Sequence, residues 1–318
     1  MFGQTAAGAS GETSTLDPSV DENERALRQC LARLRRAPLD FRLRVEGGEL
    51  LALMGQTERA LRVLRSCADY FTLAGFPLRA LWALKLLEKN GAPKMVLERG
   101  YGLLARQYAR SEDRQWGDPI FEMPLPKLGT LDLDELPQDL SEVIAEVERR
   151  ATDILRGTNF PDRLPRLPLL SDLPSEVFDT VARSIELRVY GDCDTLMEEG
   201  EPGSGVHLIV TGSCKVTKRR EGIDAVLATL SEGDVFGEMA LVDRTVRSLS
   251  ATAKTHSRLL TIKRKDFYGI IKKDPELSTK LLWSFVQVLA QRLRKTTADL
   301  SGALKNADES GPHLFKKE

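Results

Sequence analysis

The feature that most restricts the fold is a series of glycines after Tyr190 that separates short runs of alternating apolar and polar residues. The runs cover residues 206–210, 214–218, 226–230 and 259–263. The glycines that punctuate this part are Gly191, Gly200, Gly203, Gly205, Gly212, Gly222, Gly233 and Gly237. Several short strands with turn residues between them are typical of an antiparallel barrel or sandwich. We therefore predict a β domain in the second half of the chain.

The first third of the chain has helical spacing instead. Apolar residues recur three and four positions apart before Pro38, which we expect to end the first helix. These residues are Ala26, Leu27, Cys30, Leu31 and Leu34. A weak repeat follows, in which residues 54–64 align with residues 74–84. Each copy has a glycine where one helix stops and Arg-Ala-Leu-x-x-Leu on the next helix.

The repeat resembles a short tetratricopeptide-type helical array. Gly48, Gly55 and Ala60 have tetratricopeptide-like spacing, and small residues there let paired helices approach closely. The aromatic positions do not match well, so a plain helical bundle packed on its neighbour is an equal alternative.

The segment between these parts differs in composition and charge. Prolines and glycines at residues 117–137 indicate an irregular linker, and residues 141–155 have the pattern of an amphipathic helix. Residues 25–110 are strongly basic and residues 111–156 strongly acidic, although the whole chain has a net charge of −1. The two blocks either attract each other or, more simply, are solvated faces of opposite sign.

Composition argues against several classes of protein. The four cysteines and three histidines show no metal-ligand spacing, and no catalytic motif is present, so we expect no metal site and no enzyme. No apolar run approaches the roughly 18 residues that a membrane helix requires, and no secretory signal opens the chain. We therefore expect a cytoplasmic protein with free thiols.

Residues 236–251, Phe-Gly-Glu-Met-Ala-Leu-Val-Asp-Arg-Thr-Val-Arg-Ser-Leu-Ser-Ala, carry the most specific chemistry. A helical turn at 237–241 would present free backbone N–H groups that can hold an anion. Arg247 can close on the same anion with charge-assisted bonds, and Glu238 can accept a bond from a sugar hydroxyl. The pattern indicates a cleft for a molecule with one anionic and one hydroxylated end, such as a nucleotide.

This segment resembles the phosphate-binding cassette of the cyclic-nucleotide-binding domain family. That family includes bacterial catabolite activators, regulatory subunits of cAMP-dependent protein kinase and cyclic-nucleotide-gated channels. The upstream runs at 199–203, 206–212 and 230–236 match the family's glycine-marked strands. The resemblance implies an antiparallel β-barrel, a cupin-like jelly roll, over residues 165–304. Val246 and Leu249 depart from the usual proline and alanine but remove no contact group.

The resemblance also implies roles for individual residues. Glu238 would bind the ribose 2′-hydroxyl, and Arg247 and Ser248 would bind the cyclic phosphate. The cassette residues between them would complete the ligand site; they are Gly237, Met239, Ala240 and Leu241. A barrel whose pocket no longer binds is the alternative.

The last long helix, predicted over residues 274–304, resembles the dimer helix of the catabolite activators. Thr296 and Thr297 would then meet the adenine base, which favours cAMP as the ligand and a homodimer formed through residues 275–300. Ser248 also leans away from the cGMP-preferring pattern.

The combined prediction is an α+β chain in which an N-terminal tetratricopeptide-like region precedes the cyclic-nucleotide-binding barrel. The predicted parts are a disordered tail at 1–22, helices at 23–110, an acidic linker with an amphipathic helix at 111–164, the binding domain at 165–304 and a tail at 305–318. We expect a bacterial-type regulator that senses cAMP and relays binding to an unknown protein partner through its N-terminal helices. The alternative is a constitutive adaptor.

Nucleic acid is not an expected partner. The short remainder after Leu304 leaves no room for a helix-turn-helix, and the arginines of the basic block are not interleaved with aromatic residues. Residues 35–39, Arg-Arg-Ala-Pro-Leu, are a poor match to a kinase-inhibitor segment because of Pro38.

Overall fold

The computed structural model describes most of the helical and β regions in two compact units. The described residues are 18–38, 40–109, 133–153, 163–167, 170–171, 173–220, 223–239, 246–273 and pairs of residues between 278 and 302. The first unit contains residues up to Ser66 together with 124–154, and the second contains 67–123 together with 155–318. None of the described helices is long and apolar enough to cross a membrane.

In the first unit, helices α1 (Pro18–Arg36), α2 (Phe41–Leu53) and α6 (Leu140–Thr152) pack together. Two glycines on α2 allow the close approach. A Cβ at Gly47 would lie 3.1 Å from Val147 on α6, and a Cβ at Gly48 would lie 3.0 Å from Leu64. Helix α3 (Thr57–Ala74) begins in this unit, and its last residues, from Cys67, belong to the second.

Ion pairs join the basic and acidic blocks of the sequence. The Arg35 guanidinium donates to both carboxylate oxygens of Glu146, at 3.0 and 2.6 Å, and Arg59 and Arg62 share Glu148. The bonds from Arg35, together with those from Arg150, lower the pKa of Glu146 to about 2. The simpler interpretation of two independent solvated faces is therefore wrong for α6, which the basic helices hold.

The two glycines of the sequence repeat, Gly55 and Gly75, end helices as predicted, and Gly91 ends α4 in the same way. Gly55, Gly75 and Gly91 all have positive φ, and in each case the residue that follows donates to a carbonyl five positions upstream. The three bonds are Gln56 N–H to Leu51 O, Phe76 N–H to Phe71 O and Ala92 N–H to Leu87 O. This is the Schellman ending, which favours glycine at the left-handed position. The tetratricopeptide-like character itself stays a prediction.

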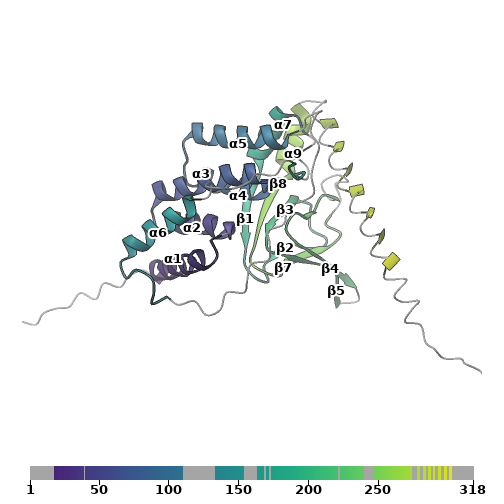
Figure 1. Cartoon of the computed structure of the whole chain (residues 1–318). Coiled ribbons are helices and arrows are strands. Elements are labelled where there is room, and N and C mark those ends of the chain that lie inside the picture. The colour runs from purple at the N-terminus through teal and green to yellow at the C-terminus, as the bar shows by residue number, and fades with distance from the viewer. Residues whose placement is uncertain are drawn as a thin grey trace, which may run out of the picture. The chain divides into compact units, whose positions relative to one another are not determined.

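The second half of the chain forms two four-stranded antiparallel sheets (Figure 1). One sheet has the order β1-β8-β3-β6 and the other β2-β7-β4-β5. The strands are β1 (Glu186–Tyr190), β2 (Thr195–Met197), β3 (Gly205–Thr211), β4 (Cys214–Arg220), β5 (Ile223–Leu230), β6 (Val235–Phe236), β7 (Ser250–Ala253) and β8 (Ser257–Lys263). The four predicted runs correspond to β3, β4, β5 and β8. The closure of these sheets into a jelly roll stays a prediction.

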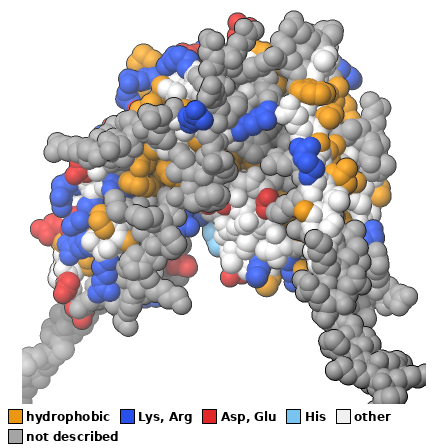
Figure 2. All heavy atoms as spheres, turned by 45° about the vertical axis from the view of Figure 1, so that its right-hand side comes forward, with side chains coloured by type: hydrophobic (Ala, Val, Ile, Leu, Met, Phe, Trp, Pro, Cys, Tyr) orange, Lys and Arg blue, Asp and Glu red, His pale blue; other side chains and the backbone are white. Residues whose placement is uncertain are grey.

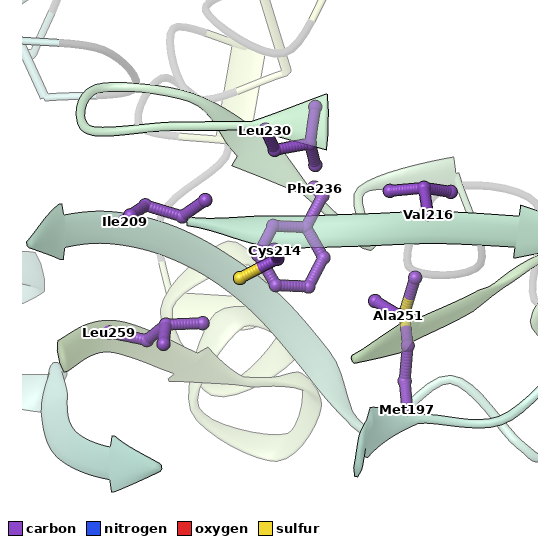
Figure 3. Packing of buried hydrophobic residues seen from close by; sticks show 8 residues of the cluster. All are labelled: Met197, Ile209, Cys214, Val216, Leu230, Phe236, Ala251 and Leu259. Atoms are coloured by element: carbon purple, nitrogen blue, oxygen red, sulfur yellow. The ribbon is translucent and has the colours of Figure 1, made fainter. Parts of the chain in front are cut away.

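The core of this β domain lies between the two sheets. Phe236 on β6 points into the space between the sheets, toward side chains from β3 and β8 and from the other sheet (Figure 3). The cluster consists of Met197, Ile209, Cys214, Val216, Leu230, Phe236, Ala251 and Leu259. Phe236 therefore belongs both to the core and to the segment that the sequence marks as the site.

Helix α4 (Pro77–Lys89) packs on the outside of the β domain, within the same compact unit. It contacts β1, β3 and α5 (Lys94–Tyr108), and α5 contacts α7 (Ser175–Ser184). The Arg79 guanidinium pairs with both oxygens of Glu232, at 3.1 and 3.2 Å, and Lys85 Nζ donates to Arg183 O. Residues 67–109 thus associate with the β domain rather than with the first helices.

Several predicted boundaries can be located on the described residues. Helix α1 begins at Pro18, inside the predicted tail of 1–22. A further helix, α9 (Arg264–Lys273), precedes the position where we predicted the last helix to start, and the described pairs between 278 and 302 have helical backbone. The boundaries at 110 and 304 lie outside the described residues.

We expect Trp82 to be a major source of stability for the second unit. Its side chain is fully buried on α4, and the Arg258 guanidinium lies 4.8 Å from its ring centroid. Trp82→Ala should lower the free energy of unfolding by about 3–5 kcal/mol in urea denaturation followed by circular dichroism. Leu53→Ala, on a side chain that is 61% exposed, is the control and should change stability by less than about 0.5 kcal/mol. Equal effects of the two variants would contradict the packing of α4.

Candidate functional site

A pocket opens at one end of the Phe236 core. Its volume, which includes space open to solvent, is about 360 Å³. It is lined by Met197, Val216, Phe236, Gly237, Glu238, Met239, Arg247, Ser248 and Leu249. The lining combines an apolar wall from the sheets with one carboxylate and one guanidinium, so the pocket has the mixed character of a small-molecule site.

The backbone of Arg247 is held by the turn at residues 199–203. Arg247 N–H donates to Glu201 O at 2.7 Å, and Gly200 N–H donates to Arg247 O at 2.9 Å. Pro202 and Val246 form an antiparallel bridge beside these bonds. Gly200 has a φ of 88°, the left-handed region that favours glycine. The glycine-rich run upstream therefore positions the arginine of the cassette.

The side chain of Arg247 is only 3% exposed and lies against backbone oxygens. Its Nη1 donates to Gly237 O at 2.7 Å, and its Nη2 donates to Gly205 O at 2.8 Å. Burial lowers the pKa of Arg247, whereas the nearby carboxylates of Glu238 and Glu201 act to raise it. A guanidinium retains its charge in such surroundings because its reference pKa is so high.

Glu238 and Ser248 complete the polar part of the pocket in different ways. The side chain of Glu238 is fully buried, whereas Ser248 is exposed at the rim, and its carbonyl oxygen accepts a bond from Lys218 Nζ at 3.1 Å. A buried carboxylate and a buried guanidinium in one pocket can bind a ligand that carries both a hydroxyl donor and an anion.

The structure brings together most of the predicted site residues. Gly237, Glu238, Met239, Arg247 and Ser248 all line the pocket, whereas Ala240, Leu241 and Thr296 lie outside the described residues. Thr297 does not line this pocket; its Oγ1 donates to Leu293 O within the last helical segment.

Sequence reasoning did not include His207 among the candidate site residues. Its Nε2 lies 3.4 Å from Arg247 Nη2, and its ring stacks on Phe236. The available signal was the strand register, because alternation along β3 places His207 and Gly205 on the same face.

Two further features of the described residues concern metal-ligating and basic side chains. No group of three or more His, Cys, Asp or Glu side chains in that part of the chain could hold a metal ion. Among the described side chains on the face that Figure 2 shows, Lys and Arg lie interspersed with acidic and apolar side chains.

Gly237 should be intolerant of a side chain. Its φ is 82°, and a Cβ there would lie 2.5 Å from Arg247 Nη1 and 3.0 Å from Gly205 O. Gly237→Ala should therefore lower the free energy of unfolding by roughly 1–3 kcal/mol through backbone strain and displacement of Arg247. The control is Gly269→Ala on α9, where a Cβ meets nothing within 4 Å and helix propensity predicts a gain of up to about 1 kcal/mol. Chemical denaturation of both variants checks this, and no difference between them would contradict the tight approach.

Comparison with known proteins finds matches to the segment that contains this pocket. Residues 187–274 match the family model described as "Cyclic nucleotide-binding domain". The chain is 34% identical over 116 residues to a cAMP-dependent protein kinase regulatory subunit of Yarrowia lipolytica, covering 36% of this chain and 30% of that protein. It is 35% identical over 108 residues to a CRP-like cAMP-activated global transcriptional regulator of Mycobacterium tuberculosis, covering 34% of this chain and 46% of that protein.

Among solved structures, the catabolite activator protein of Thermus thermophilus is 28% identical, with a TM-score of 0.37, and the match covers 42% of this chain and 62% of that one. In all three comparisons the match spans less than two thirds of the relative's length.

Proposed function

We propose that this chain, which carries a cyclic nucleotide-binding domain at residues 187–274, is a non-enzymatic cytoplasmic signalling protein that binds cAMP. The observation that carries the proposal is the placement of Arg247 beside Glu238 in one pocket. Arg247 would bind the cyclic phosphate with charge-assisted bonds, and Glu238 would accept a bond from the ribose 2′-hydroxyl. The apolar wall of Met197, Val216 and Leu249 would cover the sugar and base.

The preference for cAMP over cGMP rests on weaker features. Ser248 follows Arg247, and Thr296 and Thr297 would meet the adenine if the last helix closed over the pocket. Neither feature is independent of the family resemblance. The experiments below therefore compare both nucleotides.

The output of the sensor would be a protein partner that binds the N-terminal helices. The ion pair between Arg79 and Glu232 supports a physical route, because Glu232 lies in the turn immediately before β6, and β6 leads directly to Gly237. A ligand changes partner binding only if it has different affinity for two arrangements of such a link.

Arg247→Ala should weaken cAMP binding at least ~30-fold, because truncating one partner of a buried charge pair costs about 2–5 kcal/mol. Isothermal titration calorimetry on the whole chain measures this, with cGMP titrated in parallel. Arg149→Ala, on an exposed side chain of α6, is the matched control and should leave the affinity unchanged. Unchanged affinity of Arg247→Ala would rule out this pocket as the binding site.

A constitutive adaptor with a non-binding domain is the second candidate. It is favoured by one observation, that both terminal nitrogens of Arg247 already donate to carbonyl oxygens of the protein itself. The two functions differ in whether a cyclic nucleotide raises the free energy of unfolding. If the pocket binds, cAMP at 100 times its dissociation constant should stabilise the fold by about 2.7 kcal/mol. No stabilisation by cAMP, cGMP or a cyclic dinucleotide would favour the adaptor.

The proposed homodimer would form through residues 275–300. Apolar side chains on the described part of this helical segment are exposed and recur at helical spacing; they are Leu282, Trp283, Val286 and Leu293. A second copy of the same helix would cover such a stripe.

Trp283→Glu should convert the dimer to a monomer, because the substitution would place a charge within the apolar contact. Sedimentation equilibrium measures the mass. Met95→Glu serves as the control, since Met95 is also an exposed apolar residue, at 76%, but lies on α5. A wild-type chain that sediments as a monomer, or a Trp283→Glu variant that stays dimeric, would contradict this interface.

A further inference from the structure

His207 lies at the centre of a buried cluster next to the proposed ligand site. It is on β3, and its side chain is only 3% exposed. Its Nδ1 lies 3.0 Å from Thr261 Oγ1 on β8, and its Nε2 lies 3.4 Å from Arg247 Nη2. Its ring stacks on Phe236, with centroids 5.0 Å apart and 28° between the planes. The imidazole is therefore held on three sides.

The partners of His207 determine which of its nitrogens carries a proton. A guanidinium has only donors, so a hydrogen bond to Arg247 requires a lone pair on His207 Nε2. The proton of the neutral ring must then be on Nδ1, where it is donated to Thr261 Oγ1. Burial, and then the positive charge of Arg247, lower the pKa of His207 to about 3, which is consistent with a neutral ring. His207 is thus arranged as an acceptor toward Arg247.

We propose that His207 is a positioning residue that orients the guanidinium of Arg247 for an anionic ligand; this proposal rests on the proposed function. Three kinds of acceptor surround Nη2: Gly205 O at 2.8 Å, Ser204 Oγ at 3.4 Å and His207 Nε2 at 3.4 Å. Gly237 O accepts from Nη1. Together these acceptors fix the plane of the guanidinium before any ligand arrives, and such preorganisation reduces the ordering cost of binding.

The same bonds leave a defined part of the guanidinium for the ligand. Within the described part of the chain, the acceptors of Arg247 occupy Nη2 and one hydrogen of Nη1. Among the described residues no acceptor lies on the Nε hydrogen, which remains for an oxygen of a cyclic phosphate. His207 would therefore contribute to affinity through Arg247, without touching the nucleotide.

Substitutions at His207 can separate positioning from packing. His207→Leu removes the acceptor and keeps an apolar side chain, and it should weaken cAMP binding roughly tenfold, as expected for loss of a hydrogen bond to a charged group. His207→Gln supplies an amide oxygen as acceptor and should restore the affinity to within about threefold of wild type. In the Arg247→Lys background, His207→Leu should not weaken cAMP binding further, because the guanidinium that His207 orients is already absent.

Calorimetry with cAMP on the whole chain measures the affinities, and thermal denaturation monitors the fold. Equal weakening by His207→Leu in both backgrounds, or failure of His207→Gln to restore binding, would show a packing role only and would overturn the proposal. If His207→Leu does not fold, Thr261→Val carries the test. It removes the partner of Nδ1 and should weaken binding in the wild-type background but not in the Arg247→Lys background.

A spectroscopic readout tests the tautomer in the wild-type chain. The imidazole ¹⁵N shifts of the three histidines at neutral pH should include one neutral ring protonated at Nδ1. A His207 ring that is charged, or that carries its proton only on Nε2, would overturn the assignment; the His207→Gln variant identifies which signals belong to His207. The two proposals also fail separately. A wild-type chain that binds no cyclic nucleotide refutes the proposed function. A chain that binds cAMP through Arg247 but is indifferent to His207→Leu refutes only this inference.

Discussion

The guanidinium of Arg247 lies between two glycine carbonyls, and most features of the β domain serve that placement. Gly205 begins β3, where a Cβ would lie 2.4 Å from Ile262 O, and Gly237 follows β6 with positive φ. Both glycines let the backbone come close enough for their carbonyls to accept from one side chain. The turn at 199–203 holds the backbone of the same arginine. These bonds hold a long flexible side chain in one orientation. The side chain therefore loses its rotamer freedom during folding rather than on ligand binding.

The Phe236 core and the pocket share residues, so the packing of one affects the geometry of the other. Phe236 packs between the sheets, stacks on His207 and lines the pocket. His207 Nε2 lies 3.4 Å from Arg247 Nη2, and its Nδ1 lies 3.0 Å from Thr261 Oγ1. The polar contacts therefore lie in a low-dielectric surrounding, where charge-assisted hydrogen bonds are stronger and where a lost partner is costly. The orientation of the guanidinium is a property of the packed core, so a substitution at a position that touches no ligand can still change binding.

Sequence alone predicted the parts of this arrangement that depend on local pattern. The alternating runs predicted β3, β4, β5 and β8, and the cassette predicted that Gly237, Glu238, Arg247 and Ser248 would meet in one place. The short strands β2, β6 and β7 have two to four residues each, too few to show alternation. Alternation along β3 indicates the face on which His207 lies but not its contact with Arg247, because β3 must first pair with β6 and β8. Pairing between strands distant in sequence is not encoded in any single segment.

The position of α4 could not be predicted from local sequence pattern either. It is relevant to how ligand binding could be transmitted. Arg79 holds Glu232 at one end of a six-residue stretch, and Arg247 holds Gly237 O at the other. Between them, β6 is paired to β3 through the registers His207–Phe236 and Leu208–Val235. Val235 and Phe236, the two buried residues of this stretch, are the ones that pair with β3, whereas Glu232 is exposed. Arg79 on α4 thus contacts the turn that leads through β6 to Gly237, and this contact is the one on which the proposed relay depends.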